Sequence, residues 1–203
     1  MLKMKITTVE KAVFRRMPWA NGGGETTELH SHVEDTSGRM LWRISMADVL
    51  AAGPFSLFDG YDRILVLLEG HGLSLSYEGG GNSQLRRRYD FAKFPGDIET
   101  FATVSDGPVR DFNVIADRSS FKPDVSIVQS SGSFRILPST QIATVYSVEH
   151  DVVVEAPNKH RISLLLGNLL VIENPMEGDW NIHGSTSIVV RLDARGQRCL
   201  GSE

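Results

Sequence analysis

The chain has 203 residues, of which 41% are hydrophobic, and it carries a formal net charge of −4 with a pI near 5.9. This acidic balance argues against a nucleic acid or an anionic membrane as partner, because both require a surplus of Lys and Arg on one face. Its one cysteine, Cys199, cannot form an internal disulfide. The longest apolar runs have about five residues, far fewer than the ~20 that span a membrane, and no apolar run typical of a signal peptide follows Met1. We therefore expect a cytoplasmic protein.

Short strand-like segments dominate the first half of the chain. Asn21-Gly22 predicts a hairpin loop. Residues 41–46 alternate with period two, so that one strand face carries Trp42 and Ile44 and the other carries Arg43 and Ser45. Residues 46–52 could form either a short helix or a bent strand end. Residues 64–68 and 73–77, joined by a glycine-containing turn, predict a second hairpin, and the strand pattern continues through residues 91–94, 100–104 and 112–116.

The second half repeats this pattern after a polar segment at residues 117–133, which predicts a connector with an edge strand at 125–128. Gly96-Asp97 and Gly178-Asp179 stand before similar apolar strands, which suggests an internal duplication. We predict an all-β protein of two fused antiparallel β-barrels, with an N-terminal domain over residues 1–120 and a smaller C-terminal one over 121–203. Further strands are expected at residues 141–148, 151–155, 162–166, 169–172 and 188–192.

A metal site is the first chemistry to test. Gly24 followed by His30-Ser31-His32 imitates the start of a metal-binding cupin motif, with both imidazoles on one strand face. No carboxylate follows at the required spacing, and no later histidine lies beside Pro95-Gly96. We therefore predict no metal and no cofactor.

Signatures of covalent and phosphate chemistry are also missing. The sequence has no Gly-x-Ser-x-Gly elbow, and its cysteine lies four residues before the end. Gly22-Gly23-Gly24 lacks the Lys-Ser/Thr end of a phosphate loop. These glycines are better explained as turn residues.

A polar set on the strands is the remaining candidate site. Arg43 lies in an apolar strand, and an arginine there needs a carboxylate partner or a pocket. Arg63 begins the next strand, and Asp111 and Asn113 lie on another. A guanidinium can hold a carboxylate with two parallel hydrogen bonds, so these residues could bind a small organic acid. Alternatively, Arg43 or Arg63 forms an internal salt bridge with Asp62, Asp97 or Asp111.

Several segments, in order, resemble the HutD/Ves family of small bacterial proteins, closely over residues 6–117 and in outline beyond. The segments are Met17 to Leu29 (MPWANGGGETTEL), Trp42 to Ala47 (WRISMA), Gly53 to Ser56 (GPFS), Gly60 to Arg63 (GYDR), Leu67 to Leu73 (LLEGHGL), Asp106 to Pro108 (DGP) and Asp111 to Asn113 (DFN).

The resemblance implies an RmlC-like cupin fold with two barrels, a bicupin, without the ligands of metal-dependent cupins. It also implies a small-molecule binding or modulating role in histidine utilisation, with urocanate or N-formylglutamate as candidate ligand. No established reaction comes with it, so we do not expect an enzyme. The second barrel would serve in packing or in forming a homodimer. By position, the residues in the matching motifs are Asn21, Glu28, Arg43, Ser45, Arg63, Asp111 and Asn113.

Two alternatives to carboxylate binding stay open at this point. One is a metal-independent isomerase or hydrolase with Glu28, Asp62 or Asp111 as general base, which requires a pKa near neutrality. The other is an interaction protein whose barrel is filled by its own side chains.

Overall fold

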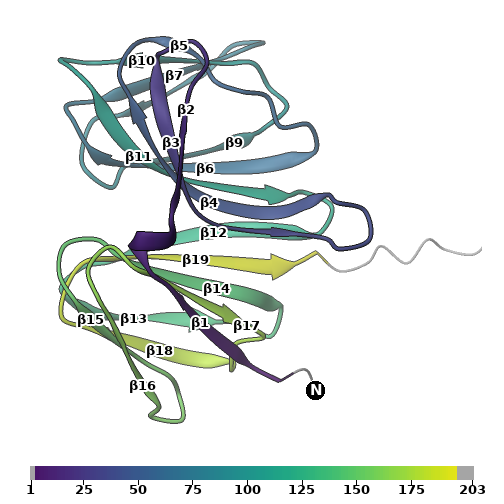
Figure 1. Ribbon diagram of the computed structural model, residues 1–203, viewed down its shortest axis with the longest axis vertical. Coiled ribbons are helices and arrows are strands. Elements are labelled where there is room, and N and C mark those ends of the chain that lie inside the picture. The colour runs from purple at the N-terminus through teal and green to yellow at the C-terminus, as the bar shows by residue number, and fades with distance from the viewer. Residues whose placement is uncertain (1–2, 196–203) are drawn as a thin grey trace, which may run out of the picture.

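The computed structural model describes residues 3–195, whose regular secondary structure consists almost entirely of β-strands. The exception is one turn of 3-10 helix at Lys11–Val13. Figure 1 shows two units stacked along the long axis of the molecule, each built from two sheets. Cys199 lies outside the described residues. None of the described helical residues forms a helix long and apolar enough to cross a membrane.

The upper unit in Figure 1 contains a large and a small sheet. In spatial order, the large sheet comprises β2 (Arg15–Pro18), β3 (Gly24–Val33), β4 (Met40–Val49), β11 (Val109–Asp117), β6 (Tyr61–Glu69) and β9 (Phe91–Pro95). The small sheet comprises β5 (Gly53–Pro54), β10 (Thr100–Val104), β7 (Leu73–Tyr77) and β8 (Asn82–Leu85).

The lower unit has the same plan. Its large sheet comprises β1 (Lys5–Val9), β17 (Leu169–Glu173), β14 (Thr140–Ser147), β19 (Ser187–Ala194) and β12 (Phe121–Val128). Its small sheet comprises β13 (Ser131–Ile136), β18 (Gly178–His183), β15 (Val152–Glu155) and β16 (Arg161–Leu164). The all-β prediction is confirmed, but residues 3–195 form four separate sheets in place of two closed barrels.

Three hydrophobic cores lie between the facing sheets. The central core joins the two units, because Ile44 and Phe112 from the upper large sheet pack with Val171 and Val190 from the lower one. A second core lies within the lower unit, and a third lies between the two upper sheets. Strands β4, β11 and β6 of the upper large sheet therefore present alternate residues to two different interiors.

The first strand departs from the order of the chain. Strand β1 pairs antiparallel with β17, with Lys5 opposite Glu173, and so completes the large sheet of the lower unit. Residues 5–9 thus cross the predicted domain boundary, and the division of the chain after residue 120 stays a prediction. The edge strand expected within the polar connector is present as β12, beside β19.

The predicted hairpin of residues 64–68 and 73–77 is wrong. Strand β6 pairs with β11 and β9, whereas β7 pairs with β10 and β8 in the opposite sheet. The turn between β6 and β7 contains Gly70 at φ +102° and turns the chain from one sheet to the other. Both strands bury Leu side chains in the third core, and two apolar runs give the same pattern in facing sheets as in a hairpin. The loop around Asn21-Gly22 does join paired strands, β2 and β3, and residues 46–49 continue β4 as a strand.

We expect Gly70→Ala to lower the free energy of unfolding by at least ~2 kcal/mol. A Cβ at this position would lie 2.7 Å from the Pro108 carbonyl oxygen and 2.7 Å from Val109 Cγ1. The matched control is Gly79→Ala, which also has a positive φ, +79°, but has no atom within 4 Å of the added Cβ. Urea unfolding of both variants tests this prediction, and an equal loss of stability in the two would contradict it.

Candidate functional site

The candidate site lies on the face of the upper large sheet that looks toward the small sheet. In β11, Phe112 and Val114 point into the central core, so Asp111 and Asn113 point the other way. Strand register places Arg43 of β4 and Arg63 of β6 on either side of Ile115. Their Cα atoms are therefore ~10 Å apart, two strand spacings.

The next residues along the strands form further polar rows. Asn113 pairs with Ser45 on one side, and Asp111 pairs with Ala47 on the same strand, β4. Asp111 lies four residues from Ile115, or ~13 Å along the strand. The sheet therefore presents a cationic row, a neutral row and an acidic residue in sequence.

A cavity of about 340 Å³ opens over these rows. Six of the seven predicted site residues line it: Asn21, Arg43, Ser45, Arg63, Asp111 and Asn113. Its volume is within the range of small-molecule sites, ~300–1,000 Å³. The space between the two upper sheets is thus not completely filled by side chains.

Aromatic rings hold the two guanidinium groups in the cavity. The Cζ of Arg63 lies 5.0 Å from the ring centroid of Phe94, 5.3 Å from Phe55 and 5.4 Å from Phe58. The Cζ of Arg43 lies 5.2 Å from the same Phe58 ring. Cation–π attraction at such distances stabilises the charge and fixes the plane of each guanidinium.

These arginines have few polar partners. Arg63 is only 5% exposed, yet within the described part of the chain its single hydrogen bond goes from Nη1 to the Ser56 carbonyl oxygen at 3.3 Å. Its Nε and that of Arg43 are buried and make no hydrogen bond to any residue of 3–195. Burial lowers the pKa of Arg63 to about 10 and also lowers that of Arg43.

Asp111 is equally isolated at the other end of the cavity. It is 1% exposed, and neither carboxyl oxygen accepts a hydrogen bond from a described residue. Burial raises its pKa to about 7, although the charge of Arg63 acts in the opposite direction. Asn113 Oδ1 likewise lacks a donor among residues 3–195. Buried polar groups in folded proteins usually have partners, so this cluster is exceptional.

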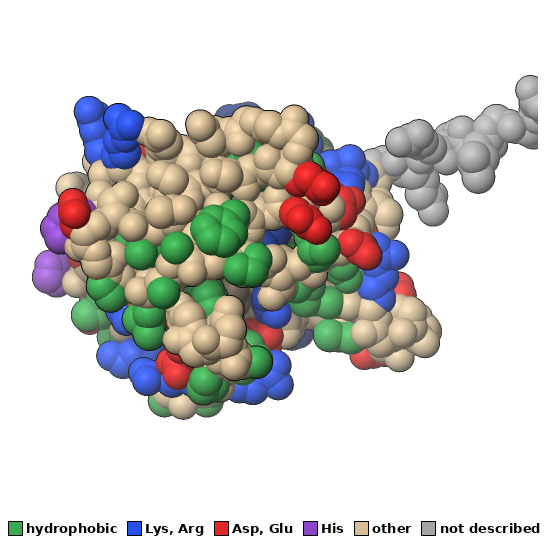
Figure 2. Space-filling model, turned by 90° about the horizontal axis from the view of Figure 1, so that it is seen from above, with side chains coloured by type: hydrophobic (Ala, Val, Ile, Leu, Met, Phe, Trp, Pro, Cys, Tyr) green, Lys and Arg blue, Asp and Glu red, His purple; other side chains and the backbone are tan. Residues whose placement is uncertain are grey.

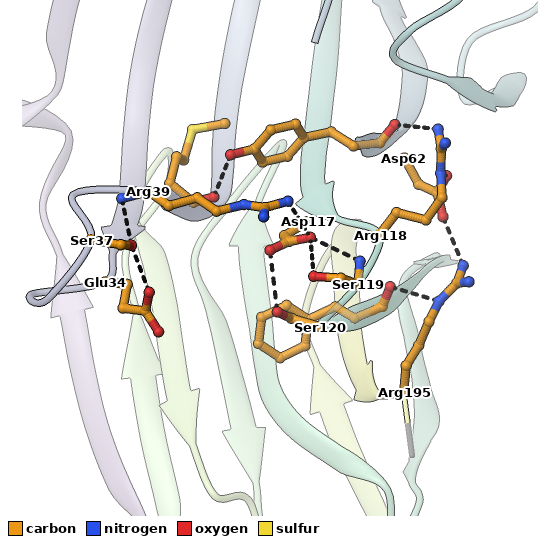
Figure 3. Close-up of polar contacts among 12 residues, drawn as sticks. Glu34, Ser37, Arg39, Asp62, Asp117, Arg118, Ser119, Ser120 and Arg195 are labelled. Carbon is orange, nitrogen blue, oxygen red and sulfur yellow. Dashed lines mark hydrogen bonds and ion pairs between the residues drawn. The ribbon is translucent and has the colours of Figure 1, made fainter. Parts of the chain in front are cut away.

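The structural salt bridges that the sequence allowed are made by other arginines. Arg118 donates from Nε to Asp62 at 2.6 Å and from Nη1 to Asp97 at 2.8 Å. Arg195 donates to the second oxygen of Asp62 at 2.9 Å. Figure 3 shows Asp62 between Arg118 and Arg195, beside the buried Asp117. Asp62 and Asp97 are therefore not the partners of Arg43 or Arg63.

Glu28 does not line the cavity. A register shift directly follows it in β3, and its Oε1 accepts hydrogen bonds from Arg15 at 3.2 Å and from Ser31 at 3.1 Å. The charge of Glu28 nevertheless raises the pKa of Arg43, against the effect of burial. Asn21 lies exposed in the β2–β3 loop, where its Oδ1 accepts a hydrogen bond from the Gly23 amide.

The histidines that imitate the start of a cupin motif pack against Trp42. The rings of His30 and His32 lie 5.3 Å and 6.3 Å from the Trp42 ring, on the opposite side of the sheet from the cavity. Burial lowers the pKa of His30. In residues 3–195 there is no group of three or more His, Cys, Asp or Glu side chains that could hold a metal ion.

Strand alternation did not predict the aromatic side chains that line the cavity. Trp19, Phe55 and Phe58 line the cavity from loops, where strand alternation cannot place a side chain. Trp19 and Phe55 contact each other edge to face at 6.3 Å between ring centroids. The signal for two of these rings was that Trp19 and Phe55 belong to motifs shared with the family that the sequence resembles.

The surface around the upper unit carries charges of both signs. Figure 2 shows this end of the molecule from above, with Lys and Arg in separate groups near the edge of the face, one larger group of Asp and Glu, and further acidic side chains scattered among them. The face has no continuous basic stripe. The cavity residues Arg43 and Arg63 thus differ from these surface charges in being enclosed.

Comparison with known proteins shows which family the chain belongs to. A sequence model of the HutD family matches residues 11–190. The chain belongs to the HutD family. A Pseudomonas putida protein described as an uncharacterized 21.2 kDa protein in the hutC 3' region is 28% identical over 187 residues, 92% of this chain and 91% of its own length. Protein Ves of Citrobacter koseri is 36% identical over 117 residues, 56% of this chain and 60% of its own.

A solved structure of another HutD family member has the same fold. HutD from Pseudomonas fluorescens SBW25 superposes with a TM-score of 0.81 at 28% identity, covering 95% of this chain and 100% of that one. The fold is cupin-like, as expected from the resemblance.

We expect the stability of the protein relative to Asp111→Asn to depend on pH. The pKa of Asp111 is raised on folding from 3.8 to about 7, so the folded state binds this proton more tightly than the unfolded state does. The free energy of unfolding of the unmodified protein should therefore fall relative to the variant between pH 4 and 7, by at most ~1.4 kcal/mol per pH unit, and be level above pH 7. Urea unfolding between pH 4 and 8 measures this difference, and a constant difference would refute the assignment.

Proposed function

We propose that this chain binds a small carboxylate metabolite in the upper cavity without a metal, and that binding modulates histidine utilisation. The observation that carries the proposal is the pair Arg43 and Arg63, enclosed in one cavity with no carboxylate bound to either among the described residues. A ligand carboxylate can accept two parallel hydrogen bonds from a guanidinium. Ser45 and Asn113 supply neutral groups that orient it.

The free-energy cost of burying arginines without a counter-ion supports this proposal. Burying a guanidinium without a counter-ion destabilises the folded state. The aromatic rings of Phe55, Phe58 and Phe94 offset part of this cost but do not neutralise the charge. A bound anion would provide both the counter-charge and the acceptors.

The proposed link to histidine utilisation is based on family membership. The name of the Pseudomonas putida relative refers to the hutC 3' region, and HutD/Ves resemblance implies a role in histidine utilisation. Urocanate and N-formylglutamate, which are both carboxylates, are the proposed ligands. We also propose that the second unit, whose large sheet forms the central core with the first, acts in packing or in a homodimer.

A second candidate function is a metal-independent isomerase or hydrolase. Asp111 favours it, because this carboxyl lies in the cavity with a pKa of about 7, suitable for a general base. Glu28 and Asp62 are weaker candidates, since both are engaged in hydrogen bonds with arginines. A new product in the NMR spectrum of urocanate or N-formylglutamate after incubation with the protein would favour the enzyme, and unchanged spectra would favour binding alone.

Isothermal titration with urocanate and N-formylglutamate tests the binding function. We expect at least one ligand to bind, and Arg63→Ala to weaken it by at least ~10-fold, since a hydrogen bond between charged groups contributes ~1.5–3 kcal/mol. The matched control is Arg135→Ala, because Arg135 lies on the lower unit, is exposed and, among residues 3–195, forms its ion pair with Asp179 alone. Absence of heat with both ligands, or unchanged affinity in Arg63→Ala, would reject the proposal.

A further inference from the structure

The cavity contains unpaired hydrogen-bond acceptors as well as donors, and a plain carboxylate cannot satisfy the acceptors. On the donor side are the Nε atoms of Arg43 and Arg63. On the acceptor side are both carboxyl oxygens of Asp111 and the Oδ1 of Asn113. A carboxylate offers only acceptors, so it would satisfy the arginines and leave the three oxygens without donors.

These two sets of atoms lie at different places in the cavity. The arginines occupy the row of Ile115, whereas Asp111 lies four residues further along β11, ~13 Å between Cα atoms. Asn113 lies between them on the same face. The charges of Arg63 and Asp111 shift each other's pKa, but the two side chains form no ion pair within the described residues. The space between them is part of the cavity that both line.

We propose that the ligand carries an N–H donor at the end opposite its carboxylate, and that Asp111 accepts the hydrogen bond from this N–H. The inference rests on the proposed function, because it takes the arginine row as the carboxylate site. It narrows the ligand class from organic acids to acids with a second, nitrogen-bearing end. Asn113 Oδ1 is placed to accept from the middle of such a ligand.

The charge environment of Asp111 makes this contact dependent on pH. Arg63 on β6 lowers the pKa of Asp111, while burial and Asp48 on β4 raise it to about 7. The pKa of Arg63 is itself lowered by the charge of Arg43 on β4 and raised by that of Tyr77 on β7. Above pH 7 the ionised carboxylate can only accept, so it requires a donor, which the proposed N–H supplies. Below pH 7 the protonated carboxyl can also donate, and the requirement relaxes.

Two probes that differ in one ring atom test the inference. trans-3-(Pyrrol-3-yl)acrylate has an N–H on the side of its ring away from the acrylate, where trans-3-(furan-3-yl)acrylate has an oxygen, and neither ring titrates between pH 6 and 8. At pH 8 we expect the pyrrole to bind at least ~10-fold more tightly than the furan, because the furan leaves a buried carboxylate without a donor. The preference should be smaller at pH 6.

Two variants test whether the preference for the pyrrole depends on Asp111. Asp111→Ala should bind both probes with equal affinity at pH 8. Thr144→Val is the control, since Thr144 is also fully buried with a hydroxyl that lacks a partner in residues 3–195, but lies on β14 of the lower unit. It should keep the pyrrole preference. The pH profile of the unmodified protein gives the same answer without relying on the fold of a variant.

The outcomes separate this inference from the proposed function. If both probes bind equally at pH 8 and both weaken in Arg63→Ala, the carboxylate site stands and the N–H contact is wrong. A tighter furan, or a pyrrole preference that survives Asp111→Ala, also overturns the contact. If neither probe binds at either pH, the carboxylate site fails and the inference fails with it.

Discussion

The alternation of side chains along β4, β11 and β6 is the constraint on which the rest of the structure depends. These strands are neighbours in one sheet, and each has apolar residues on the face toward the lower unit. That face forms the central core and fixes the register of the sheet. A shift by one residue would put Trp42 and Phe112 into the cavity and bury Arg43 and Asp111 in the central core, at a cost of several kcal/mol. The core thus holds the polar rows in place, although it contains none of their residues.

The polar rows are in turn maintained without the pairing that is usual for buried charges. Even the half-buried Arg118 has such partners, since it binds Asp62, Asp97 and the Tyr61 carbonyl, and its hydrogen bonds lower the pKa of Asp97 to about 2. Arg63 is more buried than Arg118 and has only one long hydrogen bond and three aromatic neighbours. A protein selected for stability alone would replace such a residue by an apolar one. Its presence in a cavity is the feature on which the proposed carboxylate binding rests.

Sequence reasoning was most successful where the strand period decides the outcome. Alternation separated Arg43 and Ser45 from Trp42 and Ile44, and the cavity confirms that separation. It failed for the partner of β6, because Gly70 and Gly72 send the next strand to the facing sheet and the apolar pattern is the same in both arrangements. It could not show that Glu28 turns toward Arg15, which depends on a bulge, or that Phe58 lies under both arginines, which depends on a loop.

The central claim is that Arg63 is retained for a ligand and contributes little to stability. The most direct test is urea unfolding of Arg63→Met and Arg118→Met without ligand at pH 7. Methionine keeps the apolar contacts of the arginine stem in both variants. The account predicts that Arg63→Met lies within ~1 kcal/mol of the unmodified protein or above it, and that Arg118→Met loses ~1–3 kcal/mol because Asp62 and Asp97 lose their shared donor. A loss in Arg63→Met as large as that in Arg118→Met would contradict it.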